Sequence, residues 1–307
     1  MNGFVNVLKP PGMTSHDIVN YIRCVFGIKK AGHTGTLDPG AAGVLVVCLG
    51  NATRLARFLL DNDKEYRTEI TFGVSTASGD SFGDCTFEGD ASQLTENKIR
   101  EILPLFTGRI EQVPPMTSAL KVKGKKLYEL ARSGRVIERP ARKINISRLE
   151  FVWGTGWGGP RPRALLQLVC SKGTYVRSVC TDIGKYLGCG AYMSFLVRTR
   201  VGKFEISNSK TLEQLSSAAD DGKIARAVAN VEEVFSELPA VTVKNGAVSA
   251  VLSGSKLYLP GVIQMPEGLN EGAAVRLVRS GKLLAVAVTA VDPENNERIL
   301  FKPVWVR

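Results

Sequence analysis

The sequence predicts an α+β protein, in which a mixed central β-sheet with flanking helices is followed by a small β-barrel-like module. Up to about residue 230, short runs rich in β-branched residues alternate with segments of helical periodicity. From Leu238 onward, short β-rich pieces are separated by Gly, Ser, Asn and Asp turns. We therefore expect one domain over residues 1–230 and a second over residues 238–307, joined by a connector.

The N-terminal half supplies the first expected elements. Residues 4–8 form a short strand, residues 9–12 a rigid Pro-Pro turn, and Thr14 or Ser15 caps a helix that runs to about residue 26. Further elements follow from apolar periodicity and capping signals: a helix at 53–60, a half-buried strand within 64–76, a short strand after the turn at 79–84, and a helix at 96–106.

The later part of the first domain adds two strands and two helices. Residues 164–170 predict a strand and residues 175–187 a helix that stops at Gly188. Residues 190–204 predict a strand with Met193, Phe195 and Val197 on one face, and residues 209–219 a capped helix: together these close the first domain.

Charge and composition favour a nucleic-acid partner. The 307 residues carry 40 Lys and Arg against 29 Asp and Glu, a formal net charge of +11. Between Lys121 and Arg148, ten basic residues face only Glu129 and Glu138, a net charge of +8 that is typical of an RNA backbone track. No signal peptide, membrane-length apolar stretch or C-x-x-C pair is present, so we expect a cytoplasmic protein without membrane association or metal.

The stretch from Gly32 to Gly50 presents an acidic side chain on a stiff loop. Its glycines permit tight turns and close approach to a ligand, and Pro39 fixes the backbone after Asp38. The run VLVVCL at 44–49 predicts a buried strand that anchors the loop. Catalytic carboxylates are commonly held in this way, although Asp-Pro pairs also occur in ordinary turns.

Arg177 occupies an unfavourable position in the first turn of the predicted helix at 175–187. The N-terminus of a helix carries partial positive charge, which disfavours a cation there. A carboxylate from elsewhere in the chain would resolve this conflict. The alternative is an exposed arginine in a weak surface pair.

Several of these segments resemble, in the same order, the TruB family of tRNA pseudouridine synthases. GHTGTLDPGAAGVL is similar to the signature loop of that family and departs from it at Ala42, where the family usually has Thr. KPPGMTS, SALKVKGKKLYELARSG and SKGTYVRS resemble further motifs, and the resemblance extends to Ser209. NGAVSAVLSGSKL and VRLVRSGKLLAVA resemble a PUA domain, for which a generic small barrel is the alternative.

The resemblance implies a pseudouridine synthase-like catalytic domain and a PUA-type RNA-binding domain. The expected reaction converts the uridine at position 55 of the tRNA T-loop to pseudouridine by base flipping, N-glycosidic cleavage and reattachment through C5. No groups or electrons enter or leave overall, so no cofactor is expected. The expected partner is the T-arm of tRNA, without an obligatory protein partner, and the chain is expected to be a monomer.

The same resemblance gives Asp38, Tyr66 and Arg177 catalytic roles. Asp38 acts as a nucleophile on C1′ or on uracil C6, or as a base on the 2′ proton, and each role needs an ionised carboxylate. Pairing with Arg177 would keep Asp38 ionised. Tyr66 stacks on the uracil and is a candidate for handling a proton, and Tyr175 lines the pocket.

Four further residues receive supporting roles from the resemblance. His33 fills or braces the space that the flipped base leaves, and Leu196 forms the pocket wall opposite Tyr66. Lys9 meets an RNA phosphate or braces the active-site loop, the alternative being a surface lysine beside a turn. Asp80 falls near a family aspartate that helps to order the site.

Three other functions compete with this one. A dyskerin-type synthase shares the catalytic loop but uses a guide RNA. A non-catalytic RNA-binding or tRNA-folding protein would need only the basic track and the terminal module. An RNA methyltransferase would need a glycine-rich cofactor loop after a first strand, which the sequence lacks.

Overall fold

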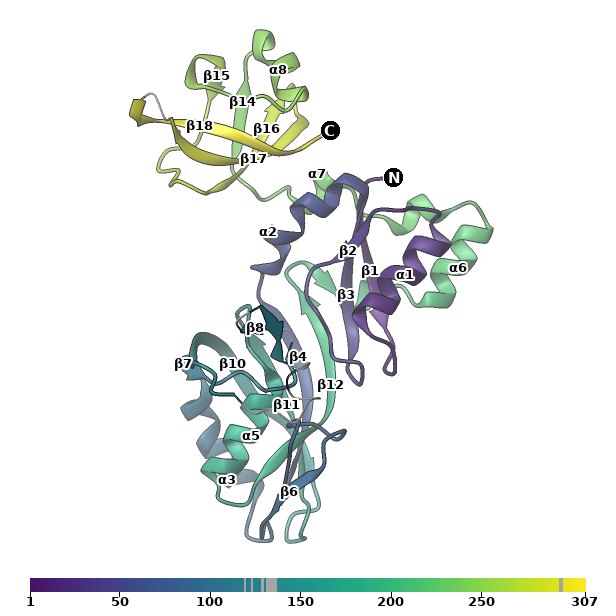
Figure 1. Cartoon of the computed structure of the whole chain (residues 1–307), viewed down its shortest axis with the longest axis vertical. Helices are drawn as coiled ribbons and strands as arrows, with labels where there is room; N and C mark the ends of the chain where they lie inside the picture. Colours follow the sequence, from purple (N-terminus) through teal and green to yellow (C-terminus); the bar gives the residue numbers. More distant parts are fainter. Residues whose placement is uncertain (119, 123, 128–129, 131–136, 293–294) are drawn as a thin grey trace.

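A nine-stranded mixed sheet organises the first part of the chain (Figure 1). The computed structural model describes residues 1–307 apart from 119, 123, 128–129, 131–136 and 293–294. The strand order is β1-β3-β12-β4-β11-β10-β7, with β2 paired to β3 and β13 paired to β12. The strands are β1 (Gly3–Lys9), β2 (Ala31–His33), β3 (Ala42–Leu49), β4 (Lys64–Phe72), β7 (Gly108–Gln112), β10 (Arg142–Thr155), β11 (Arg163–Cys170), β12 (Ala191–Val201) and β13 (Phe204–Glu205). Strands β3 and β12 run parallel and the other pairs antiparallel, so the predicted mixed sheet is confirmed.

Two groups of helices cover this sheet (Figure 1). Helices α1 (Ser15–Val25) and α6 (Leu212–Asp220) pack beside β1 and β3, whereas α3 (Glu96–Ile102) and α5 (Val176–Tyr186) pack over β4, β10 and β11. Three of these helices begin at a threonine whose hydroxyl accepts a backbone N–H from the first turn: Thr14, Thr95 and Thr211. Of the two caps expected for the first helix, Thr14 or Ser15, the structure therefore has Thr14.

Short elements connect the main ones. They are η1 (Gly50–Leu55), α2 (Ala56–Leu60), β5 (Val74–Thr76), β6 (Cys85–Glu88), η2 (Leu103–Phe106), β8 (Lys121–Val122), β9 (Lys125–Lys126), η3 (Ile206–Asn208), η4 (Ile224–Ala227) and α7 (Val231–Val234). The helix predicted at 53–60 is α-helical only in its second half, because η1 forms its first turns as a 3₁₀ helix.

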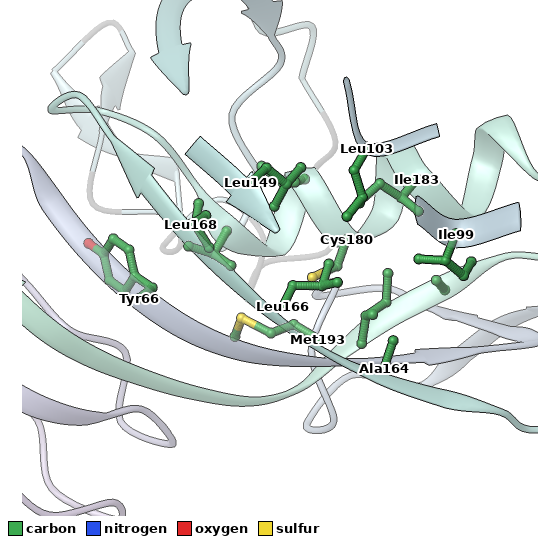
Figure 2. Packing of buried hydrophobic residues seen from close by; sticks show 14 of the residues in the cluster. Tyr66, Ile99, Leu103, Leu149, Ala164, Leu166, Leu168, Cys180, Ile183 and Met193 are labelled. Atoms are coloured by element: carbon green, nitrogen blue, oxygen red, sulfur yellow. The ribbon is translucent and has the colours of Figure 1, made fainter. Parts of the chain in front are cut away.

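The largest hydrophobic cluster lies between the sheet and α5 (Figure 2). Leu166 and Leu168 of β11 face Cys180 and Ile183 of α5 in this cluster. Tyr66 lies at one end, with its hydroxyl directed away from the labelled apolar side chains. The cluster therefore fixes the ring of Tyr66 while leaving its polar end beyond the core.

One predicted strand face is wrong because β12 is bulged. The alternation had placed Met193, Phe195 and Val197 on one face. A register shift between Met193 and Phe195 reverses the alternation, as a β-bulge does by inserting one extra residue. Met193 and Leu196 are consequently buried, whereas Phe195 is 48% exposed.

The C-terminal module is a five-stranded sheet in the order β15-β14-β16-β17-β18. Its elements are β14 (Ala240–Val243), η5 (Asn245–Ala247), α8 (Val248–Leu252), η6 (Leu259–Gly261), β15 (Val262–Gln264), β16 (Ala274–Arg279), β17 (Lys282–Asp292) and β18 (Asn295–Val306). Leu283, Val286 and Trp305 of this module share a hydrophobic cluster with Phe4 and Leu55 of the first part. The module therefore packs against the end of the first part that contains the edge strand β1 and the neighbouring 3₁₀ helix η1 (Figure 1). Within the part of the chain that the structure describes, no helix is long and apolar enough to cross a membrane.

Candidate active site

The loop that carries Asp38 lies beside β12 of the large sheet. It connects β2 to β3, and its far end enters the sheet where Ala42 pairs with Val197 of β12. Gly43 has a φ of +108°, and a Cβ there would meet the Arg198 carbonyl oxygen at 2.2 Å. Glycine at this position thus permits close packing against β12, rather than against a ligand as the sequence suggested.

Two side chains from the N-terminal segment hold the loop in place. Lys9 Nζ donates hydrogen bonds to the carbonyl oxygens of Pro10 (2.8 Å), Pro39 (3.2 Å) and Ala41 (2.6 Å). Ser15 Oγ donates to the Leu37 carbonyl at 3.1 Å and accepts the Leu37 N–H at 2.8 Å. The backbone on both sides of Asp38 is therefore fixed before any ligand arrives.

This placement contradicts the assignment of Lys9 to substrate binding. The Lys9 side chain is fully buried, and burial lowers its pKa to about 8. An ammonium group that is enclosed by three carbonyls does not reach an RNA phosphate. The structure agrees instead with the second expected role, in which Lys9 braces the active-site loop.

We expect Lys9→Met to destabilise the loop without changing electrostatic RNA binding. The carbonyl groups around Lys9 would lose their hydrogen-bond donor, which should lower the free energy of unfolding by roughly 1–3 kcal/mol. Thermal unfolding measures that loss, and the slope of log Kd against log salt measures phosphate contacts. If the slope of the variant were smaller by about one, Lys9 would contact a phosphate in the wild type, and the bracing role would be contradicted.

Arg177 joins two carboxylates from separate loops. Arg177 Nε lies 3.0 Å from Asp38 Oδ2, and Arg177 Nη2 lies 3.3 Å from Asp38 Oδ1. Arg177 Nη1 lies 3.6 Å from Asp80 Oδ2. The carboxylate that the sequence required near the N-terminus of α5 is therefore present, and Asp80 adds a second one. The Arg177 side chain is only 4% exposed, whereas the Asp38 side chain is 37% exposed, so solvent is excluded from the guanidinium but still reaches the Asp38 carboxylate.

Further contacts orient the guanidinium of Arg177. Its Nη1 donates to the Ser78 carbonyl at 3.1 Å and to the Thr117 hydroxyl, and its Nη2 donates to the Thr117 carbonyl at 3.0 Å. Asp80 is itself held by the Ser78 hydroxyl and by the Phe82 N–H. The guanidinium fork is thus satisfied by fixed partners, which sets the position of the Asp38 carboxylate.

The pKa of the Asp38 carboxyl depends both on burial and on the neighbouring charges. Burial raises the pKa of the Asp38 carboxyl, and the nearby Asp80 raises it further, while Arg177 and Lys9 oppose the rise. The net direction of the pKa shift is upward, and Arg177 limits the rise that burial would otherwise cause.

A cavity of about 880 Å³ opens beside Asp38. Five of the eight residues that the sequence assigned to the site line it: Asp38, Tyr66, Tyr175, Arg177 and Leu196. Lys9, His33 and Asp80 are not among the lining residues. The structure therefore places most of the predicted site residues around one cavity.

Tyr66 and Leu196 form adjoining parts of one cavity wall. In the register of β4 and β12, Leu196 lies opposite Thr68 and Arg198 opposite Tyr66. Tyr66 and Leu196 are therefore diagonal neighbours on one sheet face, not the opposed walls that we expected. Burial raises the pKa of the Tyr66 phenol, which keeps it neutral.

His33 stands at the start of the Asp38 loop, at the end of β2. Its Nδ1 accepts the Gly35 N–H at 3.3 Å, which places the proton of a neutral ring on Nε2. Burial and the charge of Arg198 lower the pKa of His33. The half-buried ring is therefore neutral and able to stack, consistent with the role that the resemblance implied.

Sequence reasoning missed Arg198 and Gln112. Arg198 is 2% exposed, lines the cavity and donates to the carbonyls of Val44 (2.8 Å) and Gly35 (3.1 Å). It lies two positions after Leu196, and that spacing on a strand could have revealed it. Gln112 donates to the Tyr175 carbonyl at 3.1 Å and accepts the Tyr175 N–H at 2.8 Å, for which the sequence carries no signal.

Part of the predicted basic track borders the cavity. Arg142 and Lys143, at the start of β10, are exposed and line it together with Lys172. Three of the ten basic residues, Lys123, Arg132 and Arg135, lie outside the described residues. The cavity therefore combines a half-buried carboxylate, paired with a buried guanidinium, with exposed cations at its border, an arrangement suited to a ligand that carries phosphates. Among the described side chains, no group of three His, Cys, Asp or Glu could hold a metal ion.

Family models match almost the whole chain. The model of the TruB family pseudouridylate synthase N-terminal domain matches residues 23–176, that of the tRNA pseudouridylate synthase B C-terminal domain residues 177–236, and that of the PUA domain residues 239–302. The tRNA pseudouridine synthase B of Pelotomaculum thermopropionicum is 62% identical over 306 residues, which cover 100% of this chain and 97% of the relative. That of Symbiobacterium thermophilum is 51% identical over 254 residues, which cover 83% of this chain and 82% of the relative.

Solved structures of similar fold include a protein complex and an RNA–protein particle. A Cbf5–Nop10–Gar1 complex contains a chain with a TM-score of 0.75 and 31% identity, covering 99% of this chain and 84% of that one. An H/ACA RNP bound to a substrate RNA that contains 2′-deoxyuridine gives a TM-score of 0.72 at 29% identity, with the same two coverages.

Proposed function

This chain belongs to the TruB family of pseudouridylate synthases, and we propose that it converts the uridine at position 55 of the tRNA T-loop to pseudouridine. It is an isomerase that acts on tRNA. The observation that best supports the specific reaction is the Asp38–Arg177 pair, with a 3.0 Å contact, at the wall of a cavity that Tyr66 and Leu196 also line.

In the proposed reaction, the target nucleotide leaves the RNA stack and enters this cavity. The N1–C1′ bond breaks, the uracil rotates while bound, and C5 bonds to C1′. The C5 proton is then released and N1 gains a proton, so the product is an isomer of the substrate. Asp38 attacks C1′ or C6, or removes the 2′ proton, and Tyr66 stacks on the base.

We propose that residues 1–230 form the catalytic domain and residues 238–307 an RNA-binding PUA-like domain. The five-stranded sheet of the second part supports this division, as does the PUA match over residues 239–302. Exposed Arg142, Lys143 and Lys172 are suited to hold RNA phosphates around the cavity. The reaction on tRNA also implies a cytoplasmic location.

We further propose that the chain acts as a monomer without guide RNA or a protein partner. Full-length relatives named tRNA pseudouridine synthase B reach 62% identity, whereas the chains from Cbf5 complexes are about 30% identical, which supports the tRNA enzyme over the guide-dependent class.

Tritium release from an unmodified tRNA transcript that carries 5-³H-uridine tests these proposals together. The purified chain alone should release tritium, because the C5 hydrogen is lost when C5 bonds to C1′. A transcript with cytidine in place of U55 should release none. Release from both transcripts would show that a uridine other than U55 is modified, and would contradict the proposed position. Binding of both transcripts without release from either would favour an RNA-binding protein or a guide-dependent enzyme.

The pH dependence of kcat/KM should reveal the raised pKa of Asp38. Protonation removes the carboxylate that the reaction needs, so activity falls as pH decreases through that pKa. Because burial raises it, we expect the midpoint of the acid limb to lie above about 4, the ordinary value of an aspartate. Binding of tRNA measured over the same pH range is the control, and a midpoint at or below the ordinary value would contradict the expectation.

A further inference from the structure

One residue that lines the cavity has a buried hydroxyl without a hydrogen-bond partner among the described residues. Ser118 is 4% exposed and lines the same cavity as Asp38 and Tyr66. Among the described residues, none forms a hydrogen bond with Ser118 Oγ. Buried hydroxyls are normally hydrogen-bonded, because water satisfies them in the unfolded chain and its loss is unfavourable. An unpaired hydroxyl in a residue that lines the cavity is therefore a candidate partner for a polar group of a ligand.

The location of Ser118 connects it to the catalytic pair. The preceding residue, Thr117, accepts hydrogen bonds from Arg177 through both its carbonyl and its hydroxyl. Arg177 in turn contacts Asp38 at 3.0 Å. The Ser118 backbone is thus tethered, through one residue, to the guanidinium that positions the carboxylate.

Other unpaired hydroxyls in the described part of the chain do not share this location. Thr34 and Thr199 also have buried Oγ1 atoms without a partner, but neither residue lines the cavity. An unpaired hydroxyl is therefore not by itself a sign of binding. The combination of burial, missing partner and cavity wall singles out Ser118.

We propose that Ser118 binds the uridine that enters the cavity, by hydrogen bonding to a polar group of its uracil or ribose. A serine hydroxyl both donates and accepts, so it can pair with a uracil carbonyl, the N3–H or the ribose hydroxyl. The exposed cations Arg142, Lys143 and Lys172 suit the charged phosphates, whereas a hydroxyl that is 4% exposed suits a neutral group. This inference deepens the proposed function and rests on it.

Ser118→Ala should lower activity without lowering stability. Removing an unpaired hydroxyl leaves the melting temperature of the free protein unchanged or higher. Losing a hydrogen bond to the substrate lowers kcat/KM by roughly 3- to 10-fold. Thr199→Val, which removes an unpaired hydroxyl away from the cavity, is the matched control and should leave kcat/KM unchanged. A lower melting temperature together with lower activity would assign Ser118 a structural role and overturn the proposal.

A binding measurement locates the contact on the nucleotide. T-arm hairpins carry either the target uridine or a tetrahydrofuran spacer, which lacks both the uracil and the 2′-hydroxyl. In an Asp38→Asn background, which prevents conversion, Ser118→Ala should raise Kd roughly 3- to 10-fold for the uridine hairpin and leave the spacer hairpin unchanged. Equal weakening of both hairpins, or of neither, would overturn the proposal.

Failure of this inference is distinguishable from failure of the proposed function. Wild-type protein that releases no tritium from tRNA would refute the proposed function. Active wild-type protein whose kcat/KM is unaffected by Ser118→Ala would refute only the role of Ser118.

Discussion

Replacing Asp38 by asparagine is expected to reduce turnover by about four orders of magnitude or more while leaving tRNA binding intact. Asparagine keeps the shape of the side chain but cannot act as a nucleophile or as a base. Side by side with wild type, tritium release from the 5-³H-uridine transcript measures the loss, and filter binding measures the affinity for tRNA.

The variant should remain folded because Arg177 keeps other partners. Its guanidinium still contacts Asp80 at 3.6 Å, and still donates to the carbonyls of Ser78 and Thr117. Circular dichroism and the melting temperature provide the control. Loss of both binding and turnover would indicate that Asp38 is structural, and full activity would refute its catalytic role.

Replacing Arg177 by methionine is expected to cost both activity and stability. Asp38 and Asp80 would lose their shared cation. The removal of one partner from a fully buried ion pair costs about 3–5 kcal/mol, which is an upper bound here because the Asp38 side chain is 37% exposed. The pKa of Asp38 would also rise further, because Arg177 opposes the effect of burial. Chemical denaturation measures the stability, and the acid limb of kcat/KM should move to higher pH than in wild type.

Two further variants separate the charge of Arg177 from its geometry. Arg177→Lys keeps a cation but loses the planar fork, so we expect more retained stability and a loss of kcat of about 100-fold through misplacement of Asp38. Arg200→Met is the matched control, because Arg200 contacts Glu65 at 3.1 Å while its side chain is 31% exposed. It should cost no more than about 1 kcal/mol. Wild-type turnover in Arg177→Lys would contradict the geometric role.

Local signals in the sequence were sufficient for most of the fold. Periodicity and Thr caps located α1, α3 and α5 within a few residues, and the β-branched run at 44–49 located β3. These signals are local because each element needs its own apolar face and its own end caps. The β12 bulge was not predictable in this way, since it depends on how β4 pairs with its neighbour.

The sequence by itself determined the family resemblance, the Asp38 loop and the need for a carboxylate near Arg177. Each of these follows from residue types at short spacing along the chain. Only the tertiary structure decided that Asp80 shares Arg177, that Lys9 is enclosed by three carbonyls, and that burial outweighs Arg177 in setting the pKa of Asp38. The physical reason is that partners and solvent exposure depend on segments that are distant in sequence, and these meet only when the sheet and its loops assemble.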